Sequence, residues 1–119
     1  MKLEIGMYVR TKRGQIGKVI TIGKDNVAIE FNRMWQDVIL KTNIVKDPSF
    51  NIIDLIEVGD YVNGYKVSAI YNPNGDEIVN ITLIMEYGYE TINTYFDDYS
   101  INSIVTKEQF EAMAYKVGV

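Results

Sequence analysis

The sequence contains no cysteine and no histidine. Without cysteine there are no disulfides, no thiolate metal sites and no thiol nucleophiles. Without histidine the commonest general base, the commonest zinc ligand and any imidazole-based catalytic triad are also missing. The sequence carries no phosphate-binding glycine loop, nucleophile motif or metal-ligand cluster either. We therefore predict a protein that is not an enzyme and that uses no cofactor and no metal.

Long apolar runs are absent as well. No segment approaches the roughly 18–20 consecutive apolar residues that a membrane-spanning helix needs. The first six residues, MKLEIG, do not carry the apolar core of a signal peptide. From these two features we expect a cytoplasmic protein that has no membrane partner.

Charge is distributed unevenly along the chain. Residues 1–50 contain nine Lys and Arg against five Asp and Glu, whereas residues 51–119 contain three against eleven. The net charges of the two halves are therefore +4 and −8. Such an asymmetry can orient a molecule on a charged partner, or it can draw together two half-domains or two copies in a homo-oligomer. The sequence leaves both interpretations open.

Short segments that alternate apolar and polar residues are abundant, and they are rich in β-branched and aromatic side chains. A period of two residues is typical of β-strands that bury one face. Glycine and asparagine between these segments, at 13–15, 23–26 and 72–76, predict tight turns. The predicted strands are 7–12, 16–22, 26–31, 35–40, 52–57, 60–62, 65–71, 78–85, 89–96 and 101–105.

Two helical elements are also predicted. Thr106, followed three residues later by Gln109, has the capping-box pattern and begins a helix over 106–115. Asp47 followed by Pro48 predicts a short helical turn. The helix over 106–115 is too short to be stable alone in water, so it must pack on a sheet.

Three segments of the first half recur, in the same order, in the second half. They indicate two related units, residues 1–50 and 51–119, of which the second is expanded. We therefore predict a mainly β fold of two small barrel-like antiparallel units with a short C-terminal helix, packed as one compact globule. The alignment also makes Phe50 and Phe110 equivalent core positions. The matching pairs are IGMYV (5–9) with VGDYV (58–62), GKV (17–19) with YKV (65–67), and IVKDPSF (44–50) with IVTKEQF (104–110).

A strand–loop–strand pattern with spaced glycines and valines occupies residues 6–19. The residues that carry it are Gly6, Val9, Gly14, Gly17 and Val19. In these residues the hairpin resembles the KOW-type element of ribosomal and transcription-elongation proteins. The loop is shorter than the loop of that family, and Met7 stands where an acidic residue commonly follows the first glycine. Asp60 fills that place in the second unit.

The KOW resemblance implies binding of nucleic acid or of a ribonucleoprotein through the cations around the first turn. A positively charged turn gains affinity for phosphates by releasing counterions. Against this, the second half is acidic, and few base-stacking aromatic residues lie near these cations. The other interpretation is a scaffold hairpin with a solvated basic tip. The candidate nucleic-acid-binding residues are Arg10, Lys12, Arg13 and Lys18.

Eight of the nine tyrosines lie after residue 60, and many are mixed with carboxylates in MEYGYE (85–90) and YFDDYS (95–100). Tyrosine buries a large area at low entropic cost and suits interfaces. Interspersed carboxylates would suit a basic groove, such as one that normally holds nucleic acid. Alternatively, the tyrosines fill the inside of the sheet and the carboxylates solvate its outside. The candidate protein-binding residues are Tyr87, Tyr89, Glu90, Asp97, Asp98 and Tyr99.

The segments FNIIDLIEVGDYVNGYKV (50–67) and SIVTKEQFEAMAYKVG (103–118) look like parts of small uncharacterised proteins encoded by phages and prophages of Firmicutes. That resemblance implies an accessory protein without catalytic residues that acts in the bacterial host cytoplasm. It implies stoichiometric binding of a host macromolecule, above all a host protein. Inhibition of a defence system, for instance a CRISPR effector, is one version. The alternative is the KOW-like module that uses the first hairpin.

Overall fold

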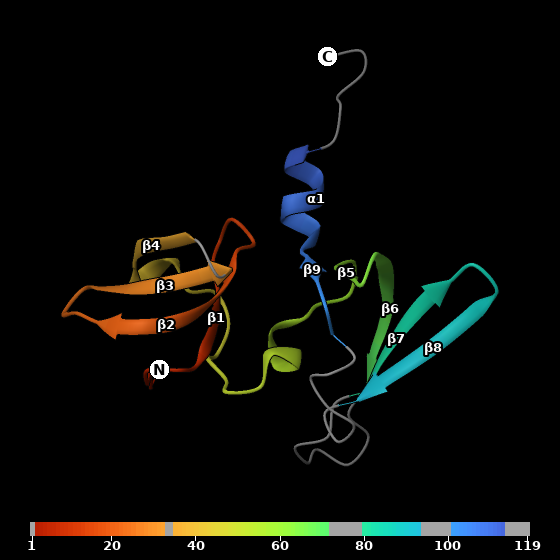
Figure 1. The fold of residues 1–119 in the computed structure, drawn as a ribbon, viewed down its shortest axis with the longest axis horizontal. Helices are drawn as coiled ribbons and strands as arrows, with labels where there is room; N and C mark the ends of the chain where they lie inside the picture. The colour runs from red at the N-terminus through yellow and green to blue at the C-terminus, as the bar shows by residue number, and fades with distance from the viewer. Residues whose placement is uncertain (1, 33–34, 72–79, 94–100, 114–119) are drawn as a thin grey trace. The chain divides into compact units, whose positions relative to one another are not determined.

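The computed structural model describes residues 2–32, 35–71, 80–93 and 101–113. It confirms a mainly β fold with two antiparallel sheets and one short C-terminal helix (Figure 1). Within these residues neither sheet closes into a barrel. The chain divides into two compact units, Met1–Leu55 (unit 1) and Ile56–Val119 (unit 2). The division predicted from the sequence, at residues 50 and 51, lies five residues earlier.

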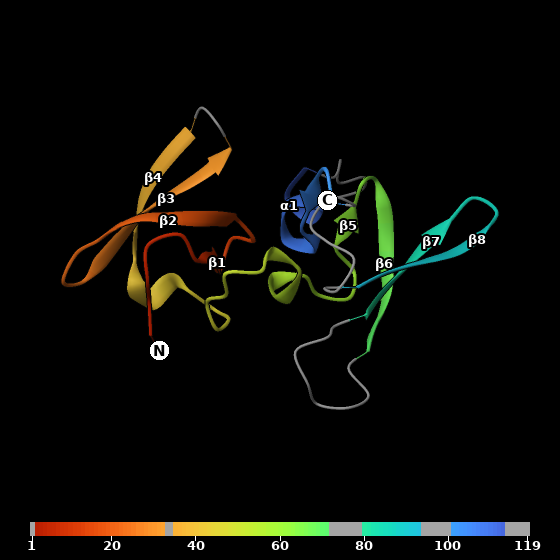
Figure 2. The same cartoon turned by 60° about the horizontal axis from the view of Figure 1, so that its bottom comes forward.

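Unit 1 is a four-stranded sheet in the order β1-β2-β3-β4, in which each strand is antiparallel to its neighbours (Figure 2). Its core is aliphatic and comprises Val9, Val19, Val27, Ile29 and Ile39, with Leu3, Phe31 and Ile44 packed against them. The elements are β1 (Tyr8–Arg10), β2 (Ile16–Ile22), β3 (Asn26–Asn32), β4 (Trp35–Leu40) and the 3-10 helices η1 (Lys41–Asn43) and η2 (Ile52–Leu55).

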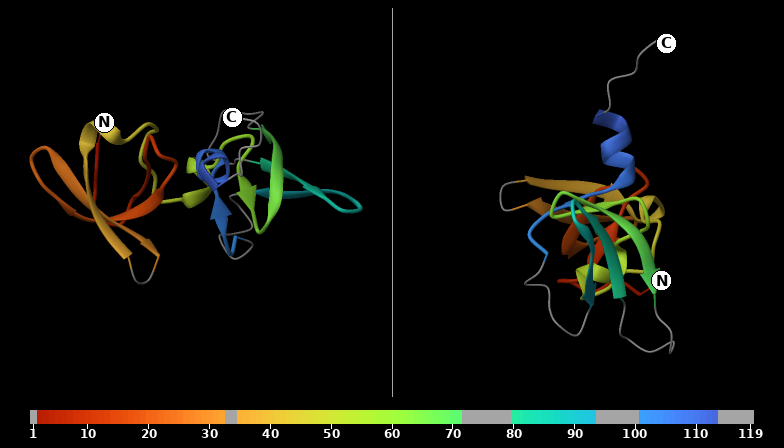
Figure 3. Two further views of the ribbon diagram at one scale, coloured as in Figure 1. Left: turned by 90° about the horizontal axis from the view of Figure 1, so that it is seen from above. Right: turned by 90° about the vertical axis from the view of Figure 1, so that its right-hand side faces the viewer.

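Unit 2 is a five-stranded sheet in the order β8-β7-β6-β5-β9, followed by one helix. Within this unit the β7–β8 hairpin reaches beyond β5, β9 and α1 (Figure 3). The elements are β5 (Tyr61–Val62), β6 (Tyr65–Tyr71), β7 (Asn80–Met85), β8 (Gly88–Asn93), β9 (Ile104–Val105) and α1 (Lys107–Met113). The buried apolar residues are Ile56, Val62, Val67, Ile81, Leu83 and Ile92.

The start of α1 is fixed to the sheet by polar contacts. The predicted capping box is confirmed, because the Thr106 N–H donates to Gln109 Oε1 at 3.0 Å and the Gln109 N–H donates to Thr106 Oγ1 at 3.3 Å. The fully buried carboxylate of Asp60 accepts the Lys107 N–H at 2.8 Å through Oδ1 and the Glu57 N–H at 2.7 Å through Oδ2. One buried side chain therefore joins the first turn of α1 to the segment before β5.

The two units share a backbone arrangement at the start of their first strands. Gly6 and Gly59 both have a positive φ, +94° and +97°, which a glycine adopts without a steric cost. The Gly6 N–H donates to the Val19 carbonyl at 2.8 Å, and the Gly59 N–H donates to the Val67 carbonyl at 3.0 Å. These contacts correspond one to one, as the echo of IGMYV and GKV in VGDYV and YKV predicted.

The correspondence continues through the following strands. The register shifts between Val19 and Thr21 in unit 1 and between Val67 and Ala69 in unit 2. The two sheets can be aligned residue by residue from these landmarks along the paired strands. Each of the five core residues of the first sheet then aligns with a buried aliphatic residue of the second. The pairs are Val9 and Val62, Val19 and Val67, Val27 and Ile81, Ile29 and Leu83, and Ile39 and Ile92.

The last predicted pair, Phe50 with Phe110, is wrong. Tyr8 lies opposite Ser49 in unit 1, and its counterpart Tyr61 lies opposite Val105 in unit 2. Phe50 therefore corresponds to Thr106. Neither ring is in a core, because Phe50 is 57% exposed and Phe110 is 51% exposed. Helix α1 carries Phe110 one turn past the strand, where it stacks on Tyr61 with the ring centroids 4.6 Å apart.

Two local predictions around residue 50 are also wrong. The segment 52–57 was expected to be a strand, but Ile52–Leu55 forms the 3-10 helix η2. Side chains bend the backbone here, because Ser49 Oγ accepts the Asn51 N–H at 3.0 Å and donates to Asp54 Oδ2 at 2.6 Å. The helical turn expected at Pro48 is absent there, and η1 ends before it at Asn43.

Candidate functional site

The exposed end of the β7–β8 hairpin is rich in tyrosine and glutamate. Met85 pairs with Gly88, so Glu86 and Tyr87 form a two-residue turn between the strands. Tyr87 is 95% exposed and Tyr89 is 74% exposed. An open pocket of about 460 Å³ lies at this end of the hairpin. We call it the hairpin pocket, and it is lined by Tyr65, Met85, Glu86, Tyr87, Gly88, Tyr89 and Glu90.

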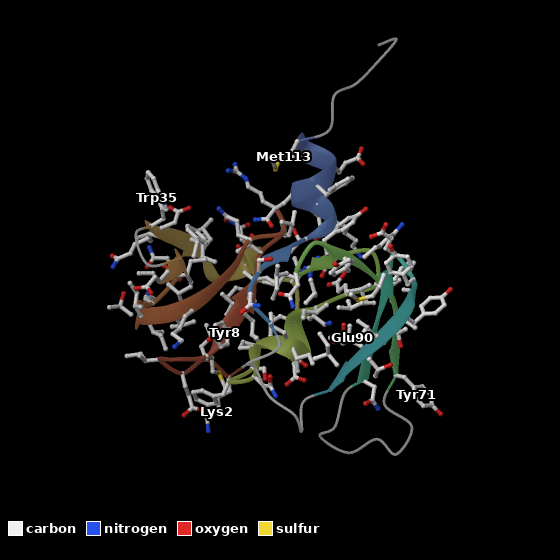
Figure 4. The ribbon with its side chains drawn as sticks, turned by 45° about the vertical axis from the view of Figure 1, so that its right-hand side comes forward. Lys2, Tyr8, Trp35, Tyr71, Glu90 and Met113 are labelled. Atoms are coloured by element: carbon white, nitrogen blue, oxygen red, sulfur yellow. The ribbon has the colours of Figure 1, made fainter. Side chains whose placement is uncertain are left out.

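The strand register explains how these side chains come together. Glu90 pairs with Leu83, which in turn pairs with Val67, so Glu90 lies on the sheet face that carries the core of unit 2. Figure 4 shows Glu90 on β8. Tyr89 pairs with Ile84 and lies on the opposite face. The hairpin pocket is therefore bordered by residues from both faces of the β8 end.

Three of the six residues predicted to bind a protein lie in this pocket, namely Tyr87, Tyr89 and Glu90. Alternation along the sequence would place Tyr87 and Tyr89 on one face of a strand, but in the structure Tyr87 belongs to the turn. The other three, Asp97, Asp98 and Tyr99, lie outside the described residues. Sequence reasoning missed Tyr65, since only the pairing of β6 with β7 brings it to the pocket.

The four cations around the first turn do not form one surface. Arg10 is fully buried, and its Nη1 donates to the Leu55 carbonyl at 2.9 Å. Its side chain therefore lies inside unit 1, where it is not accessible to a phosphate. Lys18 is exposed, with Nζ 5.5 Å from the centre of the Tyr8 ring. Only Lys12 and Arg13 lie together.

Lys12 and Arg13 line a groove of about 420 Å³ in unit 1. The β4 side of this groove contains the carboxylate of Asp37 and the exposed side chains of Val38 and Leu40. We call it the unit 1 groove, and its remaining lining residues are Thr11, Gln15, Ile39 and Asn43. The groove therefore combines two cations, one carboxylate and an apolar wall.

Metal sites and membrane-spanning helices are both lacking in the part of the chain that the structure describes. No group of three or more Asp and Glu side chains in the described ranges is arranged to hold a metal ion. No helix in those ranges is long and apolar enough to cross a membrane. The chemistry available on the two surfaces is therefore that of tyrosine, carboxylate, ammonium and guanidinium groups.

Comparisons with protein families, with curated proteins and with solved structures give no significant match for this chain.

Proposed function

We propose that this chain is a non-enzymatic, phage-type accessory protein that binds a cationic surface of a host protein through the hairpin pocket. The observation that carries the proposal is the exposure of Tyr87 and Tyr89 beside Glu86 and Glu90. Two tyrosines on one hairpin end present a large apolar area that the described residues leave exposed. Tyrosine and charged groups in such an arrangement are typical of protein interfaces.

Charge decides which kind of partner fits. Residues 51–119 have a net charge of −8, and no Lys or Arg lines the hairpin pocket among the described residues. A nucleic acid would be repelled by this half, whereas a basic protein surface would be attracted and steered toward it. A host protein that itself binds nucleic acid presents such a surface. Together with the resemblance to phage proteins, this favours a cytoplasmic inhibitor of a bacterial defence system, such as a CRISPR effector.

The proposal is tested by capturing proteins from a bacterial host lysate on the immobilised chain. The variant Glu86→Lys with Glu90→Lys reverses both carboxylates of the pocket. Its matched control, Glu4→Lys with Asp25→Lys, makes the same change in net charge on exposed positions of unit 1. We expect the pocket variant to lose the captured protein and the control to keep it. Equal capture by both variants would contradict the proposal.

A second candidate function is supported by the unit 1 groove. Lys12 and Arg13 are exposed side by side there, which fits the KOW-like nucleic-acid or ribonucleoprotein-binding module. This function requires binding to generic DNA or RNA at low salt, with an affinity that falls steeply as salt rises. Lys12→Ala with Arg13→Ala should flatten that salt dependence by about two units of slope. Arg10 is unsuitable for this test because it is buried.

A further inference from the structure

Strand β8 is an open edge of the sheet in unit 2. In the strand order β8-β7-β6-β5-β9 it is terminal, and in the described part of the chain it pairs only with β7. Proteins usually protect such edges with proline, lysine or a bulge. The β8 sequence, GYETIN, contains neither proline nor lysine, and its pairing with β7 is regular over all six residues. Among the described residues, no second strand pairs with its outer backbone N–H and C=O groups.

Unit 1 contains a carboxylate at the position that corresponds to Glu90. Asp37 pairs with Ile29 as Glu90 pairs with Leu83, and Ile29 and Leu83 are equivalent core residues. In unit 1 the cations Lys12 and Arg13 line the same groove as Asp37. Unit 1 therefore carries two cations on the groove that this carboxylate also lines.

Among the described residues of unit 2, no Lys or Arg lines the hairpin pocket. Lys12 and Arg13 belong to the loop between β1 and β2, which is closed by a hydrogen bond from the Thr11 N–H to the Gln15 carbonyl at 2.9 Å. The connection between β5 and β6 is only Asn63 and Gly64, both at positive φ. It is too short to carry a cationic side chain to Glu90. Within the described residues, the hairpin pocket therefore lacks the cationic loop that borders the unit 1 groove.

We propose that an extended, Lys- or Arg-rich segment of the partner protein adds to β8 as a new strand and places one cationic side chain in the hairpin pocket. This inference rests on the proposed function and specifies its binding mode. Backbone hydrogen bonds to β8 hold the segment, and alternate side chains face the pocket. The cation meets the carboxylate of Glu90 in a charge-assisted contact, whereas Tyr89, on the opposite sheet face, contacts the apolar side chains that alternate with the cations.

The probe for this mode is a synthetic nine-residue peptide in which arginine alternates with valine, blocked at both ends. Calorimetry measures its affinity for the whole chain, and NMR of the labelled protein locates it. We expect shifts concentrated in Gly88–Asn93, with new protection from exchange for the β8 amides that face away from β7. A peptide whose alternate backbone nitrogens are methylated keeps its charge but should bind at least about tenfold more weakly, because backbone hydrogen bonds are lost.

Matched variants test the cationic side chain separately. Glu90→Gln should lower the affinity for the parent peptide about three- to tenfold. Replacing the arginines of the peptide by neutral citrulline should lower the affinity by the same factor. Tyr89→Leu should change the affinity less than about twofold, because Tyr89 lies on the sheet face opposite Glu90 and leucine keeps an apolar contact there. Tyr89 and Glu90 are exposed, so their substitution should leave the fold intact, and the citrulline change affects only the peptide.

Failure of this mode differs from failure of the proposed function. If the parent peptide does not bind, if the methylated peptide binds equally well, or if Glu90→Gln has no effect, strand addition with a cation in the pocket is overturned. The loss of a captured host protein in the variant Glu86→Lys with Glu90→Lys would still support the proposed function in that case. If that variant captures the host protein normally, the proposed function itself is wrong.

Discussion

Replacing Asp60 by alanine should destabilise unit 2 more than any surface substitution. The carboxylate is fully buried and accepts two backbone N–H groups, from Lys107 at 2.8 Å and from Glu57 at 2.7 Å. A hydrogen bond to a charged group contributes about 1.5–3 kcal/mol, and alanine would leave both donors without this acceptor. We therefore expect a loss of about 3–5 kcal/mol in the free energy of unfolding, which is a large part of the stability of a small domain.

Urea unfolding followed by far- and near-ultraviolet circular dichroism measures this loss. The near-ultraviolet signal of the stacked Tyr61 and Phe110 reports on α1, whose first turn Asp60 holds. The control is Glu57→Gln, which removes the charge from the partly exposed ion pair between Lys107 Nζ and Glu57 Oε1 at 2.7 Å. That change should cost less than about 1 kcal/mol. If Asp60→Ala costs no more than Glu57→Gln, the anchoring role assigned to Asp60 is refuted.

Three further outcomes are expected from unfolding measurements. Arg10→Ala should destabilise the protein by about 2–4 kcal/mol because the side chain is buried and bonded to Leu55, whereas Lys12→Ala should change stability by less than about 0.5 kcal/mol. Phe110→Ala should cost about 1–2 kcal/mol rather than the cost of a core phenylalanine, because half of the ring is exposed. Gly59→Ala should cost about 1 kcal/mol or more, since its φ is +97°. These assignments would be contradicted if Arg10→Ala and Lys12→Ala had equal effects on the free energy of unfolding. A loss of about 3 kcal/mol or more in Phe110→Ala, as expected for a core phenylalanine, or a more stable Gly59→Ala would also contradict them.

Much of the fold could be predicted from local sequence. The strands predicted at 16–22, 35–40 and 65–71 have the bounds that the structure shows, because alternation and flanking turn residues act over short distances. The capping box at Thr106 was found for the same reason. The first two echoed segments identified equivalent backbone contacts, since the glycine at positive φ and the following valine are local requirements.

Features that depend on distant contacts could not be predicted. Arg10 follows an apolar residue in a strand, so alternation predicts a surface cation. Its burial depends on the carbonyl of Leu55, which lies 45 residues away in the sequence. The isoleucines of residues 52–57 favour a strand by their β-branched side chains, but the side chains of Ser49 and Asn51 bend the backbone instead. For the candidate site, exposure of Tyr87 and Tyr89 required the structure, because alternation fits inward-facing tyrosines equally well.

Site-specific photo-crosslinking in the bacterial host tests most directly whether the hairpin pocket binds a basic protein. A photoreactive amino acid replaces Tyr87, which is 95% exposed, and in a parallel strain it replaces the exposed Lys24 of unit 1. Mass spectrometry then identifies the crosslinked peptides. We predict that position 87 attaches to one Lys- or Arg-rich segment of a host protein and that position 24 does not. Crosslinks from position 87 to nucleic acid, or the same products from both positions, would contradict a protein-binding site at the β7–β8 hairpin.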